Sequence, residues 1–410
     1  MPEGALLDLD VIDGPTVDDP PVGVPAPAPP EGGDGPSPAT SGWRDIGRRA
    51  PWWARPTAIF AASRAVVGLG LYLTAVVGHR TADYILGQWD TWWFINAARR
   101  GWPSHVPMAH GHAVRSTIAF FPVFPLAVRY LTRLTGWSLL TSSLTISMVT
   151  GLTAMITVWA LVRRYAGPAA ADRATLLLAV FPGSFVISLG YSEGILITAV
   201  ACGLLALQQR RWVLAGLAGL VATGTAPVAL AFVAACLWCA VSAIRHDRQW
   251  RALAAPLLAP VGFVTYQLWL WAHTGDLSAW RATERGGWHS YPSPAYPVHL
   301  LVTVLVHPIG SVATDKILVV GIVFTAICAV VAVRDRQPPP VLIYGLGAAL
   351  LAVVSAPVGL RPRFILDAFP LILALGVRLR GVWYVVVVST SAVVMVVFTV
   401  YSIGIHSVFP

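Results

Sequence analysis

Long apolar runs recur along this chain, and each is close to the ~20 residues that an α-helix needs to cross a bilayer. A transmembrane β-barrel would instead show short segments of alternating polarity. The pattern therefore predicts an all-α polytopic membrane protein, a helical bundle of about eleven transmembrane helices. The clearest runs cover residues 57–77, 138–162, 174–190, 212–244, 252–272, 315–333, 340–356 and 382–402.

Arginines mark one end of most of these runs. Four of them precede the first run, and positive charge beside a first span predicts a cytoplasmic N-terminus. Residues 1–55, rich in Pro, Gly, Asp and Ala up to about residue 43, are expected to form a disordered cytoplasmic tail. Residues 56–410 would then be the membrane domain of a multi-pass plasma-membrane protein. The four arginines are Arg44, Arg48, Arg49 and Arg55.

Composition agrees with this class. Hydrophobic residues make up 56% of the chain and charged residues 11%, and the mean hydropathy is +0.68. The net charge of +9 comes almost entirely from arginine, with Lys316 as the only lysine. In a membrane protein such charge sets orientation, so we expect no nucleic-acid partner.

The first polar loop, residues 78–118, carries an acid among large aromatics. Trp89, Trp92, Trp93 and Ala97 share one face at helical spacing, which predicts a helix over 88–100 that lies in the membrane interface. Asp90 is the acid. On its own, this stretch is more typical of an aromatic belt than of a reaction site.

Other unusual features map to the same predicted outer side. Two prolines three residues apart in 119–125 predict a broken or re-entrant helix, and Gly224–Pro227 predicts an outer hairpin within 212–244. Glu193 lies between two apolar runs, where an acid is costly and indicates function, with helix capping or packing as the alternative. Arg361 and Arg363 lie at another outer helix end. Acids, arginines and aromatics are thus expected around one outward-facing cavity.

Glycosyl transfer from a lipid-phosphate sugar fits that set of residues. Arginine holds a phosphate leaving group, a carboxylate accepts the proton of an acceptor hydroxyl, and aromatic rings stack on sugars. An apolar groove between helices would hold the prenyl chain. The sequence contains no P-loop, no GxGxxG that opens a helix and no nucleophile elbow.

The order of these motifs resembles a known family. WD followed by aromatics, then AFFPxxP, FPxSxxxxxxYSE and RPRFxLxxFPL, between about Trp89 and Pro370, is similar to the PIG-V-type mannosyltransferases. This is the GPI mannosyltransferase II family with its bacterial relatives, of the GT-C superfamily. The resemblance implies an inverting α-mannosyltransferase that uses polyprenyl-phosphate mannose. It also implies that Asp90, in the first extracytoplasmic loop, is the catalytic carboxylate.

The resemblance has one clear departure. Bacterial relatives carry an ATRPTG-like sequence where this chain has Ala222-Thr223-Gly224-Thr225-Ala226-Pro227, so an expected arginine is absent. Arg361 or Arg363 would supply the charge instead. Two alternatives stay open: a transporter or flippase of lipid-linked sugars, and a non-catalytic subunit of a glycosylation complex.

The predicted site has Asp90 as the catalytic base and seven substrate-binding residues. Glu193 would position sugar or acceptor, and Arg361 and Arg363 would bind phosphate. The acceptor would be a hydroxyl of a lipid, glycan or protein. The seven are Trp89, Phe121, Tyr191, Glu193, His289, Arg361 and Arg363.

No cofactor is expected. His105, His110 and His112 form a loop cluster that offers a divalent-cation site as the lesser alternative, without a neighbouring carboxylate. Cys236 and Cys239 form a CxxC with no second pair.

Overall fold

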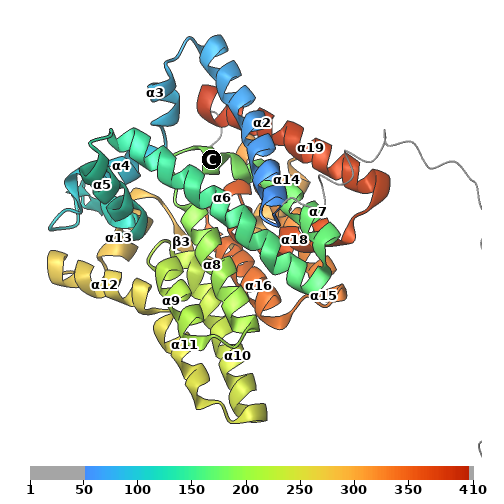
Figure 1. The fold of residues 1–410 in the computed structure, drawn as a ribbon. Helices are drawn as coiled ribbons and strands as arrows, with labels where there is room; N and C mark the ends of the chain where they lie inside the picture. Colours follow the sequence, from blue (N-terminus) through green and yellow to red (C-terminus); the bar gives the residue numbers. More distant parts are fainter. Residues whose placement is uncertain (1–50, 406–410) are drawn as a thin grey trace, which may run out of the picture. The chain divides into compact units, whose positions relative to one another are not determined.

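The computed structural model describes residues 51–405, and this part of the chain is almost entirely helical (Figure 1). The predicted all-α polytopic fold is confirmed. Most of the predicted N-terminal tail, residues 1–50, lies outside the described residues. The α-helices are α2 (Ala54–Gly78), α3 (Ala82–Leu86), α4 (Asp90–Arg100), α5 (Val123–Thr135), α6 (Leu139–Ala166), α7 (Pro168–Ala179), α8 (Glu193–Gln208), α9 (Trp212–Thr223), α10 (Leu230–Asp247), α11 (Ala254–Leu258), α12 (Val261–Thr274), α13 (Ala279–Gly287), α14 (Tyr296–Val306), α15 (Ala313–Arg334), α16 (Pro339–Val353), α17 (Pro362–Asp367), α18 (Phe369–Arg378) and α19 (Gly381–Thr399).

Short elements connect these helices. The strands form two antiparallel pairs, with Met108 opposite Ala113 and Tyr291 opposite Ala356. The strands are β1 (Met108–Ala109), β2 (His112–Ala113), β3 (Tyr291–Pro292) and β4 (Ser355–Ala356). The 3₁₀ helices are η1 (Thr117–Ala119), η2 (Pro182–Ser188), η3 (Pro227–Ala229) and η4 (Trp250–Leu253), and η5 (Val400–Ile405) is a π-helix.

The apolar helices differ in length, and only some of them are long enough to cross a membrane. Among the described residues, five helices are long and apolar enough to cross a membrane, or up to seven if each of two bent pairs is one span. This is fewer than the predicted eleven, because other apolar helices have only 10–17 residues. The five are Ala54–Gly78, Leu139–Ala166, Pro227–Asp247, Ala313–Arg334 and Gly381–Gly404.

The predicted breaks are present. The run 212–244 divides into α9, η3 and α10, and the break within 119–125 is residues 120–122, between η1 and α5. The backbone N–H of Val123 donates to the carbonyl of Gly224 over 3.2 Å, so the two breaks meet. Each break thereby satisfies backbone groups that lipid could not.

A further break divides 174–190 into α7 and η2, which meet at 77°. Arg64 of α2 is buried beside it and donates to the carbonyls of Ala179, over 2.9 Å, and Ser184, over 2.8 Å. A bend leaves carbonyls without helical partners, and a guanidinium has enough donors to bind several of them. Arg64 therefore stabilises the bend. Beyond it, α2 packs against α19 (Figure 1).

Helix α13 packs against β2 and η1 of the first polar loop. Helix α13 ends in Gly286 and Gly287, and a Cβ on Gly287 would lie 2.6 Å from the backbone nitrogen of Arg115. Arg115 donates through Nε to the carbonyl of Gly287 over 3.1 Å and lies over the ring of Trp288. Only glycine, which has no Cβ, lets the end of α13 approach the backbone of Arg115 this closely.

Gly183 provides a test of helix packing. A Cβ at this position would lie 2.1 Å from the carbonyl oxygen of Pro362, which is backbone and cannot move aside. We expect Gly183→Ala to lower the free energy of unfolding by about 1–3 kcal/mol, measured by thermal unfolding in detergent. Gly68→Ala is the control, since a Cβ at Gly68 meets nothing within 4 Å. Equal stability of both variants would contradict this packing.

Candidate active site

Asp90 is the first residue of α4, and the residues around it are held by two other parts of the chain. Trp89, at a φ of 54°, donates through Nε1 to the carbonyl of Ser402 over 2.9 Å. The hydroxyl of Thr91 accepts the backbone N–H of Gly190 over 3.2 Å. A positive φ is uncommon for a bulky residue, and strain of this kind often accompanies functional sites.

Glu193 is the first residue of α8 and is almost fully buried. Tyr191, two residues earlier, is held by Ser147 of α6. The Ser147 hydroxyl donates to the carbonyl of Tyr191 over 2.7 Å and accepts its N–H over 2.9 Å. The turn before α8 is therefore fixed by a side chain of a long span.

Arg363 of α17 joins these two acids. Its Nη1 donates to Oδ2 of Asp90, and its Nε donates to Oε1 of Glu193. The guanidinium carbon lies 4.6 Å from the centre of the Tyr191 ring, a cation–π distance. Side-chain exposure is 12% for Arg363, 21% for Asp90 and 3% for Glu193. Segments 273 residues apart thus meet in one mostly buried ion cluster.

The charges of this cluster are not balanced. Two carboxylates share one guanidinium, and Oε2 of Glu193 is buried without a hydrogen-bond partner among residues 51–405. Arg361 is half-buried just before α17, where burial lowers the pKa of its side chain and the charges of Arg363 and Asp90 act on it as well. A second cation thus lies near the first.

An aromatic chain links the cluster to the proline break. The ring of Phe94 in α4 lies 6.4 Å from that of Tyr191, and 4.8 Å from that of Phe124 in α5. Phe124 follows the Phe120–Pro122 break, which is hydrogen-bonded to Gly224. Features that the sequence places on one side are therefore connected in space.

Two predicted site residues lie elsewhere. Phe121 is 2% exposed, and its ring is enclosed by Phe263, Tyr266 and Trp280. The ring is packed into this aromatic cluster, and the predicted substrate-binding role of Phe121 stays a prediction. His289 is exposed and donates no hydrogen bond to the ion cluster.

Sequence reasoning missed Asp367. It lies four residues after Arg363 on α17, is buried, and its Oδ1 has no hydrogen-bond partner in the described part of the chain. Helical spacing of Arg363 and Asp367 in PRFILD is the signal that could have found it.

Glu284 lies on α13, and no sequence motif singles it out. Burial, and then the charge of Asp90, raise its pKa to about 8. Such a shift is typical of carboxyl groups in functional clefts. Helix α13 thus brings a second carboxyl group within electrostatic reach of Asp90.

The histidine cluster finds no support from neighbours. Within residues 51–405, no group of three or more His, Cys, Asp or Glu could hold a metal ion. His110 and His112 belong to the β1–β2 hairpin.

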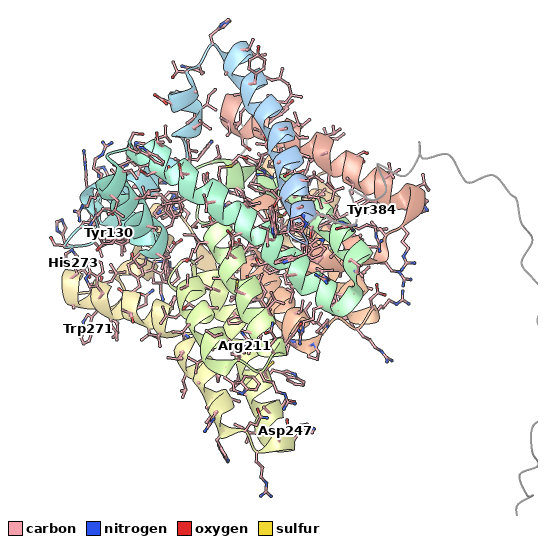
Figure 2. The ribbon with its side chains drawn as sticks, viewed as in Figure 1. Tyr130, Arg211, Asp247, Trp271, His273 and Tyr384 are labelled. Atoms are coloured by element: carbon pink, nitrogen blue, oxygen red, sulfur yellow. The ribbon has the colours of Figure 1, made fainter. Side chains whose placement is uncertain are left out.

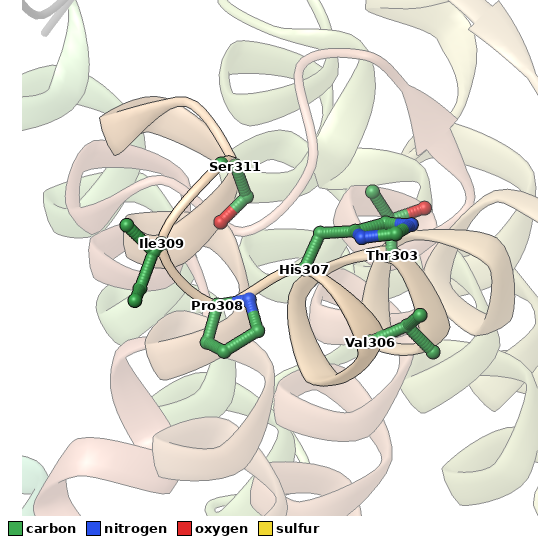
Figure 3. A pocket seen from close by; sticks show the side chains of 7 residues that line it. Thr303, Val306, His307, Pro308, Ile309 and Ser311 are labelled. Carbon is green, nitrogen blue, oxygen red and sulfur yellow. The ribbon is translucent and has the colours of Figure 1, made fainter.

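Two cavities lie outside the ion cluster. One of about 470 Å³ is formed by the loop after α14, with Thr303, His307 and Ser311 on its wall (Figure 3). A smaller one of about 280 Å³ lies along α4. Figure 2 shows polar side chains at other helix ends, such as Asp247 on α10 and His273 on α12.

Comparison with known proteins gives likeness of fold alone. No family model matches the chain, and no curated protein matches it. Solved structures that are similar include ArnT from Cupriavidus metallidurans in the apo state, at 16% identity over 78% of this chain, with a TM-score of 0.48. Archaeal oligosaccharyltransferase AglB from Archaeoglobus fulgidus is similar at 13% identity over 84%, with a TM-score of 0.42. The chain spans 60% of the length of ArnT and 56% of AglB. Likeness at this level carries no information about reaction or substrate.

Because Arg363 pairs with both Asp90 and Glu193, we expect its replacement to lower the free energy of unfolding strongly. Arg363→Met leaves Glu193 buried and unpaired, which costs about 3–5 kcal/mol. Adding Glu193→Gln should restore most of that loss, measured by thermal unfolding of the single and double variants. Arg210→Met is the control, because its pair with Asp247 is exposed, at 57% and 37%, and such pairs contribute about 0–1 kcal/mol. No restoration in the double variant would contradict the pairing.

The raised pKa of Glu284 makes the stability of the folded protein depend on pH. In the folded protein the carboxyl group of Glu284 keeps its proton up to about pH 8. In the unfolded chain the same group loses its proton near pH 4.5. Stability of the wild type therefore falls as pH rises between these values. Glu284→Gln lacks this loss, so its stability relative to wild type should rise from pH 5 to pH 8.5. A constant difference in thermal unfolding over that range would contradict the shift.

Proposed function

We propose that this chain is an inverting glycosyltransferase that moves mannose from polyprenyl-phosphate mannose to an acceptor hydroxyl at the outer face of the plasma membrane. The observation that carries the proposal is the ion cluster of Asp90, Glu193 and Arg363. It places a partly exposed carboxylate beside a guanidinium, the two groups that transfer from a lipid phosphate requires. The motif resemblance supports mannose as the sugar, and the arginine-marked helix ends support a cytoplasmic N-terminus.

Asp90 accepts the proton of the acceptor hydroxyl. The acceptor oxygen forms a bond to the anomeric carbon as the bond from that carbon to the phosphate oxygen breaks, and polyprenyl phosphate leaves with the electron pair. Inversion requires attack from the face opposite the phosphate. Base and phosphate-binding cation must therefore lie on opposite sides of the sugar, so the direct contact between Asp90 and Arg363 must open before the donor reacts.

Arg363 uses different nitrogens for its two partners, and this matters for the order of events. Nε binds the buried Glu193, while Nη1 binds Asp90. Donor phosphate can replace Asp90 at Nη1 while Glu193 keeps the guanidinium in place. Asp90 is then released to act as a base, and Arg361 adds charge for the phosphate.

The test is transfer from labelled polyprenyl-phosphate mannose by membranes that contain the full chain. Asp90→Asn should lower the rate about 10²- to 10⁴-fold, the usual contribution of a general base. Asp83→Asn is the matched control, since Asp83 is an exposed acid of α3 in the same loop. Undiminished transfer by Asp90→Asn would remove the role of Asp90. Movement of intact donor across the membrane of liposomes that contain the protein, without formation of a mannosylated product, would instead favour a transporter.

A further inference from the structure

A groove of about 280 Å³ runs along α4, beyond the ion cluster. Its wall combines indole rings with an amide, a guanidinium and a hydroxyl, and its size is near the lower end of ligand sites, ~300 Å³. It follows the same helix that begins with Asp90. The side chains that define it are Trp92, Trp93, Asn96, Arg100, Trp102 and Thr117.

The aromatic wall is rigid. Trp93 stacks on Phe120 at 6.0 Å and meets Trp288 edge-on at 5.3 Å. Trp102 donates through Nε1 to the carbonyl of Phe120 over 3.0 Å. Trp92 meets Trp93 edge-on at 4.7 Å and is 53% exposed. An exposed ring beside fixed rings forms a platform that loses little freedom on binding.

The polar wall has unused capacity. Asn96 donates through Nδ2 to the carbonyl of Trp92 over 3.0 Å, and its Oδ1 accepts no hydrogen bond within residues 51–405. Arg100 forms no ion pair in that same part of the chain. Thr117 donates its hydroxyl proton to the carbonyl of Gly101 over 2.8 Å and can still accept.

These groups match a neutral carbohydrate better than a lipid headgroup. A sugar presents apolar C–H faces to indoles and hydroxyls to amide and guanidinium groups, and aromatic side chains with a polar handle suit such mixed surfaces. An anionic headgroup would favour a cluster of several cations. The lining of this groove carries a single cationic side chain, Arg100. We propose that the groove binds the glycan of the acceptor, which makes the acceptor a neutral oligosaccharide chain.

Position along the helix agrees with this assignment, which rests on the proposed function. At 1.5 Å per residue, Trp93 lies ~5 Å and Arg100 ~15 Å along the axis from Asp90. Sugar units bound there would lead toward the base. The terminal unit would present its hydroxyl at Asp90, and preceding units would occupy the groove.

The experiment is saturation-transfer NMR on the purified full chain in nanodiscs, with mannotriose and maltotriose as probes. Ring-proton signals are expected for the wild type with at least one trisaccharide. Trp92→Ala should weaken binding roughly five- to tenfold, as expected for one aromatic contact, and Asn96→Leu should weaken it as well. Trp137→Ala is the matched control, because Trp137 is 47% exposed and does not line the groove.

The outcomes separate this proposal from the proposed function. Asp90→Asn should keep trisaccharide binding while transfer is lost. Absence of signal from both trisaccharides, or equal signal from wild type and Trp92→Ala, would overturn the glycan site and leave the groove as a membrane anchor. Transfer that survives Asp90→Asn would overturn the catalytic role of Asp90 and leave the glycan site intact.

Discussion

One buried guanidinium connects three segments of this protein that lie far apart in the sequence. Arg363 binds Asp90 and Glu193 at once, with Tyr191 against its face. In a poorly hydrated site, each charge depends on the others, because removing a partner leaves an uncompensated ion. The close approach of η2 to Pro362, which Gly183 alone permits, therefore fixes the position of the cation as well as the packing of helices.

Interrupted helices are the second constraint. Backbone groups freed at a break must find protein partners, since lipid offers none. Arg64 binds carbonyls at the bend between α7 and η2, Ser147 binds the backbone of Tyr191, and Gly224 accepts from Val123. These partners hold non-helical segments in one arrangement, and Asp90 and Glu193 lie at their ends. Rigid breaks thus position Asp90 and Glu193, each at the first residue of its helix.

Much of the site followed from residue type and order. Asp90, Glu193 and Arg363 were each selected from the sequence, because an acid or arginine at an apolar helix end is costly without a purpose. Phe121 was selected because it belongs to the proline break in 119–125, and its ring is enclosed by aromatics, since sequence reveals that a ring is apolar but not which faces are covered. Asp367 has a local signal, its helical spacing from Arg363, whereas the significance of Glu284 depends on Asp90 in a distant segment.

Apolar run length by itself determined that this protein is a polytopic helical bundle, and the prolines and glycines determined where its helices break, since both follow from local backbone and solvent requirements. Only the tertiary structure decided that Arg363 binds both acids, that α13 brings Glu284 toward Asp90, and that α4 carries a groove. Those facts depend on contacts between residues far apart in the chain, where close approach and shared charge, rather than local preference, set the geometry.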